Sequence, residues 1–221
     1  MMTWEPDVGR GAWLAGPFED VWPVPRGFDA AVAALHPADE DGTRERGRLD
    51  VELLAGVARH LAAHTSTPQD GVAAIWEGWG GLVSASGRAP LVDPGRVGFF
   101  AGIAGGLSER WRRRGEPAPD PGILPPEVAA GPRFRLPPGG DYILFRAGAK
   151  RFVDPRWVDD APWLDAVGRH SPETPSLLWP DDHAWVLVTD TEADRTVVAG
   201  SRALVDALTR DKTIETAPAH W

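Results

Sequence analysis

The residues best placed to do chemistry lie in the segment Trp179-Pro-Asp-Asp-His-Ala-Trp185, where Asp181, Asp182 and His183 stand between two tryptophans. An aspartate that orients a histidine makes a general base, so these three residues could act as acid and base groups in a cleft beside Trp179 and Trp185. The alternative is structural, because aspartates in turns commonly accept hydrogen bonds from backbone amides. Both interpretations stay open, and in both this turn is the best candidate for a functional site.

Arg112 and Arg113, in the predicted helical turn Ser108–Arg114, could grip a phosphate or a carboxylate. A solvated helix end explains them equally well, because cations favour the C-terminus of a helix. The sequence has neither a Gly-x-Gly-x-x-Gly nor a phosphate-loop motif at the start of a helix, and it has no Gly-x-Ser-x-Gly. We therefore predict no cofactor and find no serine-hydrolase signature.

Two further patterns have metal-ligand spacings. His60 and His64 lie four residues apart on a predicted helix, but the glutamate of a His-Glu-x-x-His zinc site is missing. The segment Asp190–Arg195 has acidic residues at alternate positions, but an arginine takes the place of the glycine that a calcium loop needs. We interpret the two patterns as helix-end and hairpin residues and predict no metal site.

The chain holds 11 tryptophans, one tyrosine and no cysteine in 221 residues. Trp76 and Trp79 stand among glycines, and Trp179 precedes a proline. A tryptophan has a large apolar ring and one N–H group that needs a partner when it is buried. Exposed rings could contact a sugar or a protein partner, whereas buried rings fill the core, and we favour the core for most of them.

The formal net charge is −9, with 32 acidic against 23 basic residues. Nucleic acids bind to basic surfaces, so this balance argues against a nucleic-acid partner and is compatible with a basic protein partner. We find no N-terminal signal peptide and no run of about 18 apolar residues. We therefore expect a cytoplasmic protein with no membrane segment, whose oligomeric state the sequence does not reveal.

The apolar pattern predicts helices in the first half of the chain, where they would position these groups. Leucine and valine recur at helical spacing over residues 50–64. Thr67 is typical of an N-cap and Pro68 of a first helical residue, so a second helix is predicted over 68–79 with its tryptophans turned inward. Residues 28–35 are predicted to form a short third helix.

The pattern changes in the last third of the chain. Residues 141–147 predict a strand, and residues 184–190 and 196–199 predict the two strands of a β-hairpin. Ser201 is typical of an N-cap and predicts a helix that runs through Arg210. We expect this hairpin and its helix to form the core of the C-terminal half.

These elements predict an α+β fold with an N-terminal helical part followed by a small antiparallel sheet, the β-hairpin, with a packed C-terminal helix. The mostly helical part covers residues 1–115, a proline-rich linker or loop covers 116–138, and the α+β part covers 139–221. The alternative is that all three form one integrated domain.

Three stretches carry a family resemblance. They are residues 65–80, which end in Trp-Glu-Gly-Trp-Gly, residues 136–145, which read Leu-Pro-Pro-Gly-Gly-Asp-Tyr-Ile-Leu-Phe, and residues 171–204, which contain Leu-Trp-Pro-Asp-Asp-His-Ala-Trp. On these stretches the chain resembles a family of uncharacterised actinobacterial proteins, over about residues 61–215. The family has no established activity, so the resemblance implies a shared fold and no mechanism.

The first functional hypothesis is an acidic cytoplasmic interaction protein, in concrete form an immunity- or antitoxin-like protein that masks a basic partner. The second is a small-molecule enzyme that uses Asp181, Asp182 and His183, and the third is carbohydrate binding on exposed tryptophans. A pocket open to the His183 ring would favour the enzyme, whereas an exposed apolar patch of a few hundred Å² would favour the interaction protein. The candidate ligand- or partner-binding residues are Trp76, Trp79, Trp179, Arg112 and Arg113.

Overall fold

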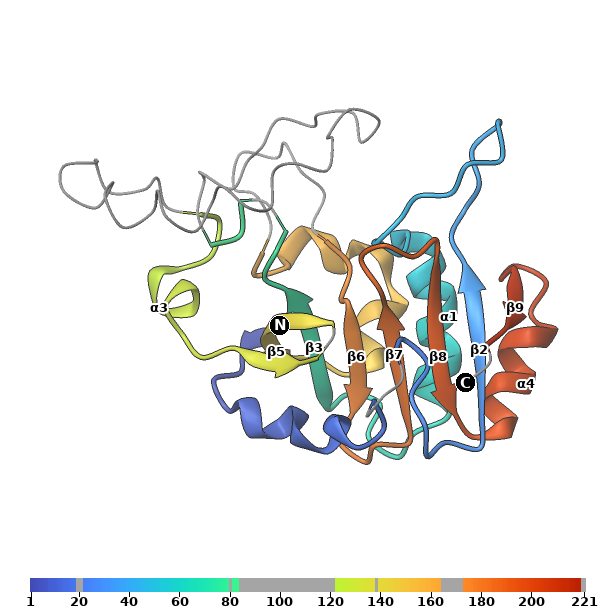
Figure 1. Cartoon of the computed structure of the whole chain (residues 1–221), viewed down its shortest axis with the longest axis horizontal. Coiled ribbons are helices and arrows are strands. Elements are labelled where there is room, and N and C mark those ends of the chain that lie inside the picture. The colour runs from blue at the N-terminus through green and yellow to red at the C-terminus, as the bar shows by residue number, and fades with distance from the viewer. Residues whose placement is uncertain (19–21, 80, 84–121, 138, 164–172, 220–221) are drawn as a thin grey trace.

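The centre of the molecule is one antiparallel sheet of nine strands, in the order β1-β5-β3-β6-β7-β8-β2-β9, with β4 also paired to β5 (Figure 1). The computed structural model describes residues 1–18, 22–79, 81–83, 122–137, 139–163 and 173–219. The strands are β1 Thr3–Trp4, β2 Ala30–Leu35, β3 Gly71–Trp76, β4 Phe134–Leu136, β5 Gly140–Arg146, β6 Leu177–Pro180, β7 Trp185–Thr189, β8 Arg195–Gly200 and β9 Thr216–Pro218.

The helices are few and short. Asp50 caps the longest one by accepting hydrogen bonds from the amides of Glu52 and Leu53, and Ser201 caps the last one at the amide of Leu204. No helix in the described ranges is long and apolar enough to cross a membrane. The α-helices are α1 Val51–Ala63, α3 Pro126–Ala129 and α4 Arg202–Arg210, and the 3-10 helices are η1 Val8–Ala15, η4 Ala149–Val153 and η5 Pro155–Asp160.

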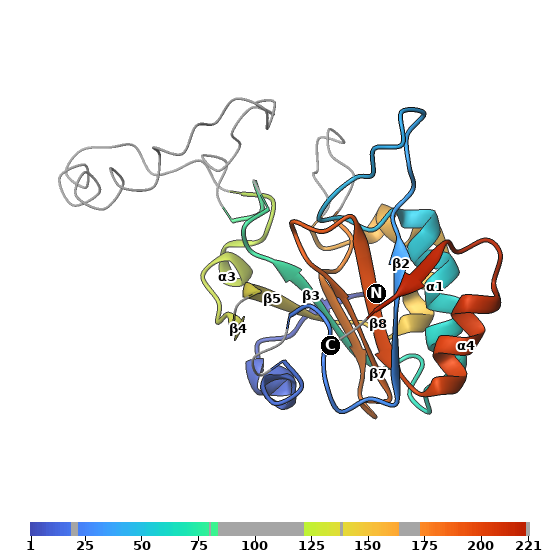
Figure 2. The same cartoon turned by 45° about the vertical axis from the view of Figure 1, so that its right-hand side comes forward.

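The two faces of the sheet carry two separate cores. On one face α1, α4, η4 and η5 pack over a cluster that includes Trp185 and Leu204. On the other face the N-terminal segment, with Leu14 of η1 and Phe18, packs over a cluster that includes Trp179. Figure 2 shows α1 and α4 on one side of the sheet and the N-terminal segment on the other. The central strands are therefore buried on both faces, as in the all-buried pattern of β7.

The predicted fold class is wrong, because a nine-stranded sheet with few short helices replaces the helical N-terminal part and the small sheet. The predicted helix over 28–35 is the strand β2, which pairs with β8 and β9. The predicted helix over 68–79 contains the strand β3, which pairs with β5 and β6. Both strands are rich in alanine, a strong helix former, and pairing with neighbours on both sides overrides that preference. Thr67 caps no helix there, and its carbonyl instead accepts a hydrogen bond from the Asp70 amide in a turn.

The hairpin and the helix predicted for the last third of the chain are confirmed, as parts of the larger sheet. The β7–β8 hairpin pairs Trp185 with Gly200 and Thr189 with Thr196, and the helix after Ser201 is α4. The strand over 141–147 is β5, and the helix over 50–64 is α1. Strands that precede and strands that follow the proline-rich residues 116–138 share the one sheet.

Trp185→Ala is expected to lower the free energy of unfolding by about 3–5 kcal/mol, because it opens a cavity in the core. The Trp185 side chain is 0% exposed, and its Nε1 donates a hydrogen bond to the Leu61 carbonyl over 3.0 Å. Urea denaturation followed by circular dichroism measures the loss. Trp13→Ala, at a partly exposed tryptophan, is the control and should cost clearly less. A loss below about 1 kcal/mol for Trp185→Ala would contradict its place in the core.

Candidate functional site

The segment that contains Asp181, Asp182 and His183 is the tight turn between β6 and β7. The amide of His183 donates to the Pro180 carbonyl over 3.1 Å and closes the turn. His183 has a φ of 54°, in the left-handed region that residues other than glycine adopt rarely. The sharp reversal gives each of the three side chains different neighbours.

Asp182 is held by the loop between α1 and β3. Its carboxylate accepts hydrogen bonds from the Thr65 hydroxyl, the Ser66 hydroxyl and the Ser66 amide, each over 2.7 Å, and from the Ala184 amide over 3.1 Å. Partial burial raises the pKa of Asp182, but the hydrogen bonds from Ser66, Thr65 and Ala184 outweigh it and lower the pKa to about 2. The carboxylate therefore stays ionised at neutral pH, with its oxygens already engaged.

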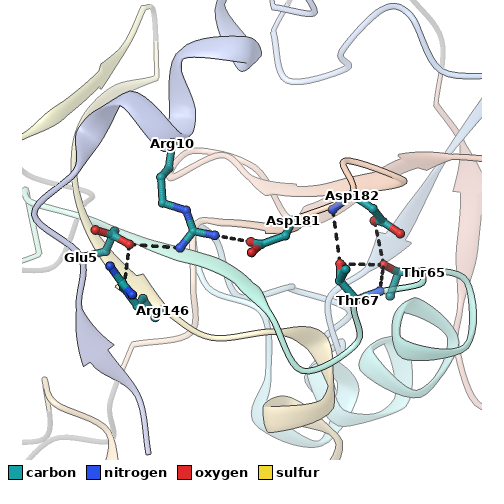
Figure 3. Close-up of polar contacts among 7 residues, drawn as sticks. All are labelled: Glu5, Arg10, Thr65, Thr67, Arg146, Asp181 and Asp182. Carbon is teal, nitrogen blue, oxygen red and sulfur yellow. Dashed lines mark hydrogen bonds and ion pairs between the residues drawn. The ribbon is translucent and has the colours of Figure 1, made fainter.

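Asp181 belongs to a chain of ion pairs that ends inside the protein (Figure 3). Arg10 contacts Asp181 with one guanidinium nitrogen and Glu5 with another, the latter over 3.0 Å. The Glu5 carboxylate, 1% exposed, also receives Arg146 at 2.7 Å and the Asp7 amide at 3.0 Å. Burial raises the pKa of Glu5, yet the Asp7 amide and the two arginines lower it overall. A buried charge with this many partners stabilises the fold only while the whole set is intact.

The His183 ring stacks on Trp13, with ring centroids 4.2 Å apart and planes at 15°. No described hydrogen bond joins the His183 ring to Asp181 or Asp182, and His183 lines none of the described pockets. The turn thus lacks an aspartate–histidine pair of the kind that acid–base catalysis needs. The acid–base role of these residues stays a prediction that the geometry does not favour.

We call this arrangement the polar clasp, which is made of Glu5, Arg10, Thr65, Ser66, Arg146, Asp181 and Asp182. It joins four segments: the N-terminus, the α1–β3 loop, the end of β5 and the β6–β7 turn (Figure 3). Each of its carboxylates is satisfied by donors from another segment. The polar clasp therefore holds the N-terminal segment against the sheet and engages all three of its carboxylates in contacts within the fold.

Trp179 and Trp185 do not line a common cleft. Trp179 is 1% exposed in the core under the N-terminal segment, 6.1 Å from the Phe134 ring, whereas Trp185 lies in the core under α1. Neighbouring strands carry the two rings to opposite faces of the sheet. Trp179 is therefore a packing residue in this structure and presents no surface to a ligand.

Trp76 and Trp79 lie together, with edge-to-face rings 5.7 Å apart, and both are partly buried. A Cβ atom on Gly78 would lie 2.2 Å from the Trp76 ring, and one on Gly140 would lie 2.9 Å from its Nε1. Gly78, within the Trp-Glu-Gly-Trp segment, and Gly140, at the start of β5, thus make room for the Trp76 ring. This packing favours the core interpretation for Trp76.

The remaining candidates do not join this site. Arg112, Arg113 and the predicted turn Ser108–Arg114 lie outside the described residues. His60 donates a hydrogen bond to the Asp211 carboxylate over 2.8 Å, and the His64 ring contacts the His60 carbonyl. Within the described ranges no group of three or more histidine, aspartate or glutamate side chains could hold a metal ion.

Sequence reasoning missed Glu5, Arg10 and Arg146, because the ion pairs Arg10–Asp181 and Glu5–Arg146 span 171 and 141 residues and leave no local spacing to read. It interpreted the Thr65-Ser66-Thr67 run as the start of a helix, although the same hydroxyls serve Asp182. The only available signal was the coincidence of a hydroxyl-rich loop and an acidic turn.

Comparison with known protein families, with curated proteins and with solved structures finds no match to this chain. The resemblance to the uncharacterised actinobacterial family therefore stays a prediction.

Asp182→Asn is expected to lower the free energy of unfolding by about 1 kcal/mol at pH 7, a value discounted for the partly exposed site. The folded-state pKa of about 2 lies below the ordinary 3.8, so this contribution is present above about pH 4 and is lost as the pH falls towards about 2. Thermal unfolding of wild type and variant across that range measures it. The difference should shrink with the pH, and a difference that is the same at pH 7 and at about pH 2 would contradict the assignment. Asp159→Asn, an exposed residue that loses the same charge, should match wild type.

Proposed function

We propose that this chain is an interaction protein that binds a basic protein partner, in concrete form an inhibitor that masks the partner as immunity proteins and antitoxins do. The proposal places the encounter in the cytoplasm. The observation that carries it is a projection of the chain, residues 36–48, which we call the acidic hairpin. It extends beyond the end of the sheet in both views (Figures 1 and 2).

The tip of the acidic hairpin is formed by Asp39, Glu40 and Asp41, and all three are exposed. Among the described contacts none of them pairs with a cation. Hydrogen bonds from the Thr43 amide and side chain lower the pKa of Asp41, which keeps it ionised at neutral pH. The tip thus presents three negative charges without an ion-pair partner among the described contacts, and such charge accelerates association with a basic partner and selects for it.

The tip has a defined shape. The Asp39 amide donates to the Thr43 carbonyl over 2.8 Å, and the Gly42 amide donates to the Asp39 carbonyl over 2.9 Å. Gly42 has a φ of 83°, which glycine adopts without steric cost. An isolated bridge between Ala38 and Arg44 continues the pairing below the tip.

The base of the acidic hairpin is pinned to the sheet. His36, 0% exposed, contacts the Glu45 carbonyl with Nδ1 at 2.8 Å and the Thr196 hydroxyl with Nε2 at 3.0 Å. Burial lowers the pKa of His36, so the ring is neutral at pH 7. Arg44 reaches both carboxylate oxygens of Glu215 at 2.8 Å. A projection held in this way loses little conformational entropy when it binds.

A groove of about 470 Å³ opens beside this base, between α1 and the segment before β9. Its lining combines apolar side chains, among them Leu53 and Ile214, with charged ones. Such a groove suits the long aliphatic stem and charged head of a partner's arginine or lysine. The charged lining residues are Asp50, Glu52, Glu215, Arg44 and Arg59.

The proposal rests on charged residues, because the described residues show no exposed apolar patch that could support it. Met1, at 95%, is the only large apolar side chain among the described residues that is exposed. The partly buried tryptophans, Trp76 and Trp79 among them, pack against the cores. We therefore expect recognition by electrostatic attraction with little apolar contact.

Removing the tip charges tests the proposal. Asp39→Asn/Glu40→Gln/Asp41→Asn is expected to weaken binding of a fluorescein-labelled octa-arginine peptide about tenfold at physiological salt, measured by fluorescence anisotropy. Asp29→Asn/Glu127→Gln/Asp159→Asn removes the same charges from three separate exposed positions and should bind as wild type does. The proposal fails if the two triple variants weaken binding equally, or if wild type does not bind the peptide.

Gly56 offers a test of the packing beside the groove, because it lies in the middle of α1 and lines the groove. A Cβ atom there would meet Arg59 at 3.6 Å and Ile214 at 3.8 Å, which are ordinary contact distances. Gly56→Ala is therefore expected to raise the free energy of unfolding by about 0.5–1 kcal/mol, the usual gain for a helix interior. Gly71→Ala is the contrast, because its Cβ would lie 2.4 Å from the Trp179 carbonyl and should destabilise the fold. A loss of stability in Gly56→Ala would show that the fold itself requires this glycine.

A further inference from the structure

Two hollows lie on the surface on either side of Gln69 and Lys150, near the C-terminal end of α1. The first, of about 310 Å³, is lined by Arg146, Lys150 and Arg151 together with backbone of the β5–η4 connection. The second, of about 550 Å³, is lined mainly by apolar groups. Because Gln69 and Lys150 line both, one ligand can occupy the two hollows together.

The first hollow gathers three cations on a chain whose net charge is −9. Two of them are already paired: Arg146 holds Glu5, and Arg151 contacts Asp160. Lys150 has no ion pair and no side-chain hydrogen bond among the described contacts, and its side chain is exposed. Asp154, the acidic lining residue, is itself paired with Arg156 at 2.8 Å. Lys150 is thus the side-chain cation of the first hollow that has no described partner, which suits a ligand that carries negative charge.

The second hollow supplies the apolar half of a site. Ala62 and Ala63 at the end of α1, Pro68 in the α1–β3 loop and Val153 at the end of η4 line it. Arg59 is its other charged lining residue besides Lys150. Apolar groups beside a few charged ones are the common composition of small-molecule sites.

Backbone contacts fix the position of the residues between the two hollows. The Lys150 amide donates to the Pro68 carbonyl over 2.8 Å. A Cβ atom on Gly148 would lie 2.4 Å from the Gln69 carbonyl carbon, so only glycine allows the loop to approach η4 this closely. Ala149 and Phe152 anchor η4 in the core at 0% exposure. The site is therefore formed before any ligand arrives.

We propose that these two hollows bind a small amphipathic carboxylate, with its head at Lys150 and Arg146 and its apolar body over Ala62, Pro68 and Val153. The charge-assisted hydrogen bond from Lys150 fixes the head. Burial of the hydrocarbon body supplies most of the affinity. The tip of the acidic hairpin takes no part in this site, although Arg59 lines both the second hollow and the groove beside that hairpin.

Decanoate, kept below its micelle-forming concentration, is the probe, and isothermal titration calorimetry is the measurement. Wild type should bind one decanoate saturably, and Lys150→Gln should weaken the binding roughly tenfold, as expected for loss of one charged hydrogen bond. Lys212→Gln is the matched control, because Lys212 is exposed and is the only other lysine of the chain. Acetate and decanol, which carry the head and the body alone, should each bind at least tenfold more weakly than decanoate.

Chemical modification of the two lysines also shows where decanoate binds. Limited acetylation with acetic anhydride, quantified by mass spectrometry, should slow at Lys150 when decanoate is present and stay unchanged at Lys212. The proposal is overturned if decanoate shows no saturable binding, if the two lysine variants bind alike, or if decanol or acetate equals decanoate. Equal protection of both lysines would also overturn it.

Discussion

The central strands of the sheet are buried on both faces, and the rest of the structure follows from the need to cover both. An antiparallel sheet usually leaves one face to solvent. Here α1, α4 and the two short helices after β5 cover one face, and an irregular N-terminal segment covers the other. That segment joins the sheet through the short pairing of β1 with β5. Side chains attach it further, through the polar clasp and through the stacking of Trp13 on His183.

The same double burial explains what the sequence could and could not predict. The β7–β8 hairpin was predictable, because β-branched residues dominate both strands and a short polar turn joins them. The strands β2 and β3 were not, because Ala-Ala-Val-Ala-Ala-Leu and Gly-Val-Ala-Ala-Ile-Trp lack the polar alternation of a one-sided strand. For the candidate site, the residues of the turn could be located in the sequence. Their roles could not, because the groups that engage Asp181 and Asp182 lie 171 and about 116 residues away along the chain.

Both proposed binding regions lie along α1, which spans 13 residues and therefore about 20 Å. The acidic hairpin precedes the end that begins at Val51, and the hollows beside Lys150 lie near the end that closes with Ala63, while Arg59 lines both the groove and the second hollow. Their charges are opposite, so a single acidic or basic partner would not occupy both. The α1 helix belongs to the core and links the two regions rigidly.

The place of β2 in the sheet has a consequence for how the chain is made. Within the described ranges, residues Ala30–Leu35 pair with Arg195–Gly200 and Thr216–Pro218, which follow them in the chain by at least 160 residues. During synthesis, β2 therefore emerges well before either of its partner strands. An apolar strand with two open edges is prone to pair with other chains. A nascent chain arrested before residue 195 would expose both edges of β2 to chaperones or to aggregation.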